Sequence, residues 1–324
     1  MATKKKVKLK IKIKWKNLLI LLLGTTLMIF LIVKWIGWIK DSLQDHKNKE
    51  PEIKENKTKQ KEEPKETPKQ KIKTEEEKKL DKLNNVNKNI DYFNMNYLDR
   101  YIEYKEKNND LDDIQIVKNV NMNLDKEHYQ DTEPAKYLNT LNILVNKHYY
   151  LENDYVPDNL ESIDRKYALS GMKLVKEAKE AFERMARDAK KEKLNIVAMS
   201  TYRSYDYQVN LYNRYVNTDG KEAADTYSGR PGQSEHQTGL AVDVFDNEID
   251  YTKFEKTNEF NWMQEHAQEY GFILRYPKDK IEETGYMYES WHYRYVGEEV
   301  AKYIKENNIS YEEYYATKIK DWNE

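Results

Sequence analysis

A long apolar run near the N-terminus, Leu18–Ile39, most constrains how this chain can fold. A helix of about 20 apolar residues crosses the hydrocarbon core of a bilayer, and this run reaches that length if Lys34 extends toward the interface. Eight lysines and no acidic residue precede the run, in residues 1–17. Such a charge excess keeps a tail in the cytoplasm. The sequence therefore predicts a single-pass cell-membrane helix at 18–39, with a cytoplasmic tail at 1–17 and the chain after the helix extracellular.

Two other interpretations of the apolar run fit less well. A cleaved signal peptide needs a small-x-small site just after the run, but Gly24 and Thr25 lie inside it. A buried core helix is hard to reconcile with eight flanking lysines. We therefore expect the helix to remain as an anchor.

The segment after the run has almost nothing apolar to bury. Residues 41–80 hold 12 lysines, 11 acidic residues and three prolines. Segments of this composition stay solvated and disordered, and charges that nearly cancel favour a spacer over a binding surface. We expect a disordered linker over 40–88 and a globular part from residue 89.

The globular part, 89–324, is long enough for one substantial core. Residues 91–324 carry 31 basic and 45 acidic groups, a net charge of −14, which argues against a nucleic-acid binder. The chain has no cysteine, so disulfides, thiolate metal sites and a cysteine nucleophile are all excluded.

Helical and strand patterns are interspersed in the globular part without strict alternation, which is typical of an α+β fold. A supporting part, 91–165, precedes a catalytic core, 166–324. Apolar residues recurring on one face give the clearest helix, Gly171–Lys191. The other predicted helices are 96–107, 204–215 with Ser204 as N-cap, 253–270, 298–306 and 311–321. The predicted strands are 114–120, 140–145, 194–201, 240–245, 272–276 and 291–296.

One stretch of the core combines a histidine with a buried-strand pattern, from Ser234 to Asp243. Gly239 permits a tight turn, after which Ala241 and Asp243 face the same side of a strand. A carboxylate on an inward face is costly unless it is paired or bound to a metal. His236, on the preceding turn, can fold back toward the same point.

A second histidine, His292, opens another strand in the string Glu289-Ser-Trp-His. Two imidazoles and one carboxylate form a three-ligand zinc set, and three protein ligands are typical of catalytic zinc. Glu289, three residues before a ligand, can reach a zinc-bound water as a general base. A structural zinc site would need a fourth protein ligand, for which His266 is the spare histidine.

The local strings together resemble the zinc D-alanyl-D-alanine carboxypeptidases of the VanY type, a group of metallopeptidases. They match the SxHxxGxAxD and ExWHxxY-type patterns of that family, and the resemblance extends from about Tyr92 to Tyr315. The strings that carry it are Ser234–Asp243, Glu289–His292, Ser200–Gln208, Gly271–Pro277 and Trp291–Gly297. It implies a single zinc-peptidase domain with a small mixed, mainly antiparallel sheet flanked by helices.

The resemblance also implies roles for individual residues. It implies that His236, Asp243 and His292 bind one zinc ion, and that Glu289 is the catalytic acid and base. Arg203 matches an arginine near the scissile carbonyl, where a guanidinium stabilises the oxyanion. Gln208 and Ser234 match positions that contact the substrate's terminal residue and carboxylate, although both are also suited to capping backbone groups.

The expected function is that of a membrane-anchored hydrolase that removes the terminal D-Ala from peptidoglycan stem peptides. Two alternatives stay open at this stage. One is an L,D-carboxypeptidase acting on tetrapeptide stems, since the metal set does not fix which bond is cleaved. The other is a non-catalytic wall-binding module on the same fold, because fold alone does not assign function.

Overall fold

The computed structural model describes residues 73–320, which lie in one compact unit beginning at Lys71. The predicted membrane helix, 18–39, and most of the predicted linker lie outside the described residues. Among residues 73–320, no helix is long and apolar enough to cross a bilayer.

A four-stranded sheet forms the centre of the unit. Its strands follow the order β5 (Val197–Ser200), β6 (Ala241–Phe245), β8 (His292–Tyr295) and β7 (Phe272–Leu274), and every neighbouring pair is antiparallel. Two small two-stranded sheets accompany it. The strands β1 (Glu133–Pro134) and β2 (Tyr149–Tyr150) are parallel, and β3 (Leu160–Ser162) and β4 (Lys173–Val175) are antiparallel. The predicted α+β fold with an antiparallel sheet flanked by helices is confirmed, but the central sheet is wholly antiparallel and not mixed, since the parallel pair β1–β2 forms a sheet of its own.

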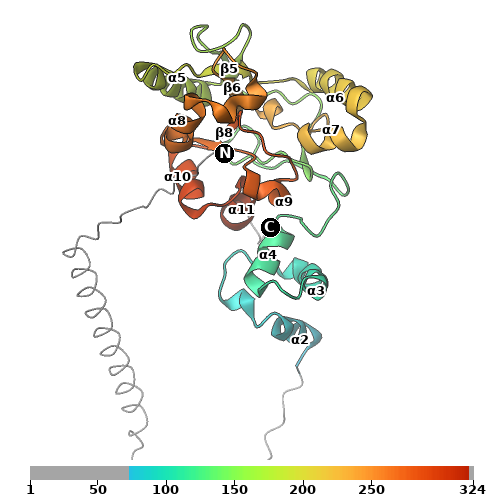
Figure 1. Ribbon diagram of the computed structural model, residues 1–324. Coiled ribbons are helices and arrows are strands. Elements are labelled where there is room, and N and C mark those ends of the chain that lie inside the picture. Colours follow the sequence, from blue (N-terminus) through green and yellow to red (C-terminus); the bar gives the residue numbers. More distant parts are fainter. Residues whose placement is uncertain (1–72, 321–324) are drawn as a thin grey trace, which may run out of the picture. The chain divides into compact units, whose positions relative to one another are not determined.

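Helices flank the central sheet. Figure 1 shows α5, α8 and α10 gathered on one side of the sheet, with α6 and α7 on the opposite side. The bounds are α5 (Lys176–Lys191), α6 (Tyr205–Asp219), α7 (Lys221–Tyr227), α8 (Asn258–His266), α9 (Ile281–Thr284), α10 (Glu298–Asn307) and α11 (Tyr311–Tyr314). Shorter helical turns are η3 (Glu235–Thr238), η4 (Tyr251–Lys256), η5 (Ala267–Tyr270), η6 (Lys278–Lys280) and η7 (Tyr315–Ile319).

The main core lies between α5 and the sheet. The predicted apolar face of α5 is buried, and its Phe182 ring lies 6.2 Å from that of Phe272 on β7. The helix starts at Lys176, later than the predicted Gly171, because residues 173–175 pair with β3 as strand β4. The prediction of Ser204 as N-cap of α6 is confirmed, since its side chain accepts from the backbone N–H of Tyr207.

The N-terminal helices have a core of their own. They are α2 (Glu75–Lys82), α3 (Leu98–Lys107) and α4 (Asp113–Asn121), with short turns η1 (Val86–Lys88) and η2 (Met95–Tyr97), and they bury a cluster that includes Leu83, Tyr101 and Ile116. Helix α2 lies inside the segment expected to be disordered linker. A capping box formed by Thr74 and Glu77 starts the helix. The ordered part therefore begins well before residue 89.

Two predicted strands of the supporting part are wrong. Residues 114–120 belong to helix α4, because Asp112 caps the helix and the buried Ile116, Val117 and Val120 follow helical spacing. Residues 140–145 form no strand. Ile143, Leu144 and Val145 are buried, but the carbonyls of Leu141 and Ile143 accept from the guanidinium of Arg294 and not from a neighbouring strand.

The predicted helix over 253–270 is interrupted. Thr257 has extended backbone and caps the new helix α8 by accepting from the N–H of Phe260, so η4, α8 and η5 follow one another. Gly271 follows in a left-handed conformation and ends this series at residue 270, the predicted end of the helix.

Candidate active site and metal centre

Two of the three predicted metal ligands are cross-strand neighbours. Asp243 on β6 pairs in register with His292 on β8, so both side chains leave the same face of the sheet. On the other side of β6, the register of β5 shifts between Ala198 and Ser200, which places Ser200 opposite Asp243. Bulges of this kind redirect side chains next to functional sites.

The third predicted ligand, His236, reaches this face from turn η3. Gly239 ends the turn with φ of 69°, and a Cβ there would lie 2.9 Å from the side chain of Leu160. Only glycine adopts this conformation and fits this space without strain. The turn thus brings His236 back over the start of β6, as the sequence predicted.

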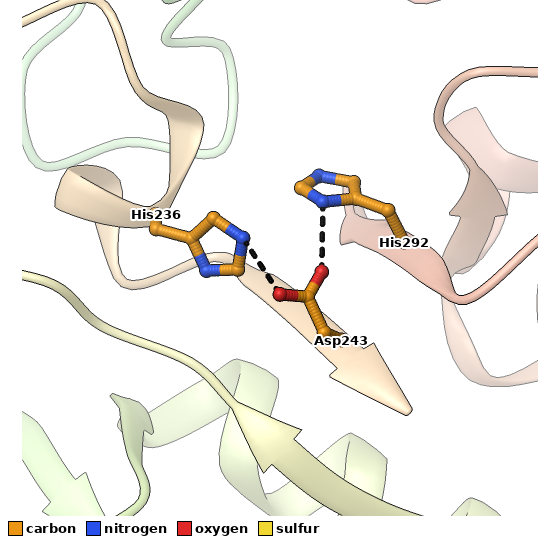
Figure 2. Close-up of side chains that lie close together, drawn as sticks. All are labelled: His236, Asp243 and His292. Carbon is orange, nitrogen blue, oxygen red and sulfur yellow. Dashed lines mark hydrogen bonds and ion pairs between the residues drawn. The ribbon is translucent and has the colours of Figure 1, made fainter. Parts of the chain in front are cut away.

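The three side chains converge on one point (Figure 2). Nε2 of His236 lies 3.3 Å from Oδ2 of Asp243, and Nδ1 of His292 lies 3.0 Å from Oδ1 of the same carboxylate. Their ligand atoms all lie within 4.8 Å of one another, and all three residues are buried. A buried carboxylate facing two imidazoles is a donor set suited to a divalent cation.

The orientation of each ring fits zinc. Nδ1 of His236 lies 2.7 Å from the carbonyl oxygen of Thr201 and donates to it, which leaves Nε2 as the electron-pair donor. Two neutral imidazoles and one carboxylate supply three ligands, the number found in catalytic zinc sites. His266 is not a fourth, since it lies on α8 against Trp262 and Glu269.

Glu289 lies beside this metal centre. One carboxylate oxygen is 3.6 Å from Nδ1 of His292, and the residue is 7% exposed. Burial raises the pKa of Glu289 to about 8, and the negative charge of Asp243 acts in the same direction, while His292 opposes it. A carboxyl group with a raised pKa in a cleft is suited to taking and returning a proton near neutral pH.

Arg203 also reaches the metal centre. Its Nη2 donates to Oδ2 of Asp243 at 2.7 Å, and its Nε donates to Oγ of Ser200 at 3.0 Å. Arg203 thus lines the cavity beside the metal centre. The direct bond to the carboxylate of Asp243 was not foreseen, because it depends on the register of β5 against β6.

A cavity of about 400 Å³ opens over these residues. Gln208 and Ser234 both line it, together with an aromatic wall that includes Tyr215, Tyr251 and Trp291. The amide nitrogen of Gln208 donates to Oγ of Ser228 and to the carbonyl oxygen of Gly229, whereas its buried Oε1 has no partner among the described residues. Gln208 therefore presents a fixed acceptor at the cavity.

Three tyrosines near the metal centre differ in their contacts. The ring of Tyr276 stacks on His292 with centroids 4.8 Å apart, and Tyr286 packs against Tyr276. Both line the cavity. Tyr288 instead contacts Lys278, whose Nζ lies 4.4 Å from the ring centroid.

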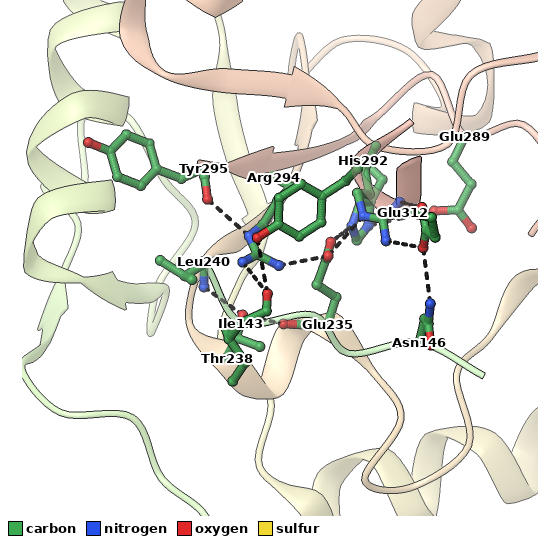
Figure 3. A network of polar contacts seen from close by, with 12 residues as sticks. Ile143, Asn146, Glu235, Thr238, Leu240, Glu289, His292, Arg294, Tyr295 and Glu312 are labelled. Carbon is green, nitrogen blue, oxygen red and sulfur yellow. Dashed lines mark hydrogen bonds and ion pairs between the residues drawn. The ribbon is translucent and has the colours of Figure 1, made fainter. Parts of the chain in front are cut away.

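Glu235 is the site residue that sequence reasoning missed (Figure 3). It is buried beneath the metal centre, with Oε2 3.2 Å from Nε2 of His292 and Oε1 accepting from Arg275 and Arg294 at 2.9 and 2.8 Å. Burial by itself would raise the pKa of Glu235. The positive charges of Arg275 and Arg294 outweigh burial, so the pKa is lowered and the carboxylate stays ionised. The available signal was a charged residue directly before a ligand in a string that otherwise becomes apolar.

The supporting part, 91–165, forms hydrogen bonds with residues next to the metal centre. Asn146 donates to Glu312, which accepts two further bonds from Arg275, and the amide of Gln237 donates to the carbonyls of Glu152 and Tyr155. The cavity over the metal centre is lined by residues of the catalytic core. Residues 91–165 therefore contact the catalytic core without lining the cavity, in keeping with a supporting part.

Comparison with known proteins agrees with this geometry. The VanY family model, described as D-alanyl-D-alanine carboxypeptidase, matches residues 171–298. The putative carboxypeptidase YodJ of Bacillus subtilis is 37% identical over 218 residues, which cover 61% of this chain and 78% of that protein. The chain belongs to the VanY family of D-alanyl-D-alanine carboxypeptidases.

Two further proteins are similar to this chain. The bifunctional D-Ala-D-Ala dipeptidase and carboxypeptidase VanXYC of Enterococcus gallinarum is 33% identical over 183 residues, covering 55% of this chain and 94% of that protein. The structure of the LD-carboxypeptidase LdcB is 37% identical with a TM-score of 0.55, covering 59% of this chain and 92% of that one.

Family membership and the site together assign the enzyme class. The His236–Asp243–His292 set lies in the matched region, with Glu289 and Arg203 beside it. The VanY-family protein is therefore a zinc carboxypeptidase, a hydrolase with zinc as its cofactor. A non-catalytic binding module has no need of a buried carboxyl group at the metal.

Proposed function

We propose that this VanY-family enzyme removes the terminal D-Ala from the stem peptides of peptidoglycan. The observation that carries the proposal is Glu289, a buried carboxyl group beside a His-Asp-His zinc set at the floor of an open cavity. Relatives in the family are named for cleavage of D-Ala-D-Ala. The proposed reaction is hydrolysis of the last peptide bond.

The residues of the site have separate roles in the proposed hydrolysis. Zinc held by His236, Asp243 and His292 would polarise the attacking water and the scissile carbonyl. Glu289 accepts a proton as the water oxygen attacks the carbonyl carbon. When the carbon–nitrogen bond breaks, Glu289 returns that proton to the leaving amine of D-Ala.

Two further groups suit the substrate at this cavity. The Arg203 guanidinium lies at the metal centre, where a fixed positive charge stabilises the oxyanion that develops on the attacked carbonyl. The partnerless Oε1 of Gln208 offers an acceptor for an N–H of the substrate, and Ser234 offers a hydroxyl on the same wall. These groups support recognition of the terminal residue.

A tetrapeptide is the second candidate substrate. The observation that favours it is the likeness to the LD-carboxypeptidase LdcB, with 37% identity and a TM-score of 0.55. The family description and VanXYC instead favour the D,D bond of a pentapeptide. The metal set serves either substrate, so the walls of the cavity decide between them.

The proposed location follows from the sequence. The apolar run Leu18–Ile39 with its lysine-rich flank supports a membrane anchor, and the charged linker would hold the enzyme at a distance from the bilayer. An extracellular site near the membrane would give access to the cell-wall substrate.

Mass spectrometry of defined peptides tests the proposal. The full-length chain, solubilised in mild detergent, is incubated with a pentapeptide ending in D-Ala-D-Ala and separately with the tetrapeptide. We expect loss of one alanine that stops with a chelator and returns with zinc. Cleavage of the tetrapeptide alone would move the activity to the L,D class, and cleavage of neither peptide would overturn the proposal.

A further inference from the structure

Glu235 joins the zinc ligand His292 to a buried network of charges (Figure 3). Glu235, Arg275, Arg294 and Glu312 are at most 3% exposed. Arg275 donates to both carboxylates, through Nε to Glu235 at 2.9 Å and through its two terminal nitrogens to Glu312 at 2.8 and 2.6 Å. Arg294 donates to Glu235 at 2.8 Å.

The network is balanced in charge. Two carboxylates face two guanidiniums, so the buried charges compensate one another without help from His292. Nη2 of Arg294 donates to the carbonyls of Leu141 and Ile143, and its Nε donates to the carbonyl of Tyr295. With its surroundings satisfied in this way, Glu235 is held as an ionised group in one orientation.

This orientation divides the two oxygens of Glu235 between different partners. Oε1 accepts from both arginines, and Oε2 lies 3.2 Å from Nε2 of His292. An ionised carboxylate can only accept, so Nε2 must carry the hydrogen. The electron pair of Nδ1 is then left facing Asp243, 3.0 Å away, where the other ligand atoms lie.

We propose that Glu235 is the positioning residue that fixes the ring and the tautomer of His292 for zinc binding, and that Arg275 and Arg294 hold Glu235 in place. The inference rests on the zinc site of the proposed function. His236 is fixed differently, by the neutral backbone carbonyl of Thr201 at 2.7 Å. A carboxylate partner makes His292 the more basic of the two imidazole ligands.

Glu235→Gln tests this role because it should reverse the hydrogen bond between residue 235 and Nε2 of His292. The amide oxygen takes the place of Oε1, because both arginines donate there, and the amide NH₂ then faces Nε2 of His292. That contact favours a hydrogen on Nδ1, the tautomer unable to bind metal. We expect the dissociation constant for zinc, measured by competition with a chelator on the full-length solubilised chain, to rise by about 10- to 100-fold.

Glu312→Gln is the matched control. It removes the same charge from the same arginine, Arg275, but among the described residues Glu312 bonds Arg275 and Asn146 and makes no hydrogen bond or ion pair with His292. Both variants should lower the melting temperature of the metal-free protein, whereas zinc affinity should stay within about threefold of wild type in Glu312→Gln. Equal zinc affinity losses in the two variants, or none in Glu235→Gln, would overturn the inference.

Glu235→Asp keeps the test decisive if Glu235→Gln does not fold. It preserves the charge balance but draws the carboxylate back from His292 by one methylene group. We expect weaker zinc binding from a folded protein, and unchanged binding would show that the hydrogen bond is not needed. Failure of the wild-type chain itself to bind zinc would instead reject the proposed metal site.

Discussion

The guanidinium of Arg203 donates to Asp243 Oδ2 at 2.7 Å, and the same carboxylate faces both imidazoles of the metal centre. Arg203 is thus hydrogen-bonded to a zinc ligand, and it also lines the cavity where the substrate carbonyl would bind. Its second bond, to Ser200, fixes the direction of the guanidinium plane.

Replacing Arg203 with methionine should lower kcat by about 10²- to 10³-fold, the loss seen when a single oxyanion donor is removed. Lysine should restore only part of this rate, because it lacks the planar fork that bonds Ser200 and Asp243 together. Steady-state kinetics with the cleaved peptide gives the measurement. Arg184→Met, which breaks a surface pair with Glu298, is the matched control and should leave kcat unchanged. A normal kcat in Arg203→Met would remove Arg203 from the mechanism.

Glu289→Gln should lower kcat by about 10²- to 10⁴-fold, because the amide cannot accept the proton of the attacking water. The three metal ligands are untouched, so metal analysis should still find one zinc per chain. Glu265→Gln, at an exposed position on α8, serves as the control. Full activity in Glu289→Gln would show that another group is the base.

Gln208→Leu should act mainly on substrate binding. The substitution removes the buried acceptor Oε1 and both bonds from the amide nitrogen, so we expect KM to rise about tenfold with a smaller change in kcat. Kinetics at varied peptide concentration separates the two constants. Gln115→Leu, on α4, is the control outside the cavity. An unchanged KM would argue against a substrate contact at Gln208.

Lys147 should make stability depend on pH in the alkaline range. Burial lowers the pKa of Lys147 from 10.5 to about 8, although Nζ donates to the carbonyl of Gly285 and lies 4.7 Å from the centre of the Tyr286 ring. Between pH 8 and 10.5 the unfolded chain binds more protons at this residue than the folded chain, so folding becomes more favourable as pH rises.

The Lys147→Met variant lacks this titration. Denaturant unfolding at a series of pH values gives the free energy of unfolding of both proteins. Between pH 7 and pH 10 this free energy should rise in the wild type relative to Lys147→Met. A difference between the two proteins that does not change with pH would show that folding does not lower the pKa of Lys147.

Much of the site was predictable because its residues belong to short local patterns. A turn with Gly239 followed by an apolar strand determines that Asp243 faces inward, and His292 opens a strand in the same way. The apolar face of α5 and the cap at Ser204 were readable for the same reason, since both depend on neighbours along the chain. The supporting part was misread where β-branched residues in α4 resembled a strand.

The sequence by itself determined the ligand types, the carboxyl group of Glu289 beside them, most helix-forming and strand-forming segments of the core, and the charged character of the segment before it. Only the tertiary structure decided that Glu235 binds His292, that Arg203 bonds Asp243 directly, and that Asn146 and Glu312 brace the site. These contacts join residues 40 to 166 positions apart. No local periodicity encodes such pairs, because they arise from strand register and from the need to neutralise buried charge.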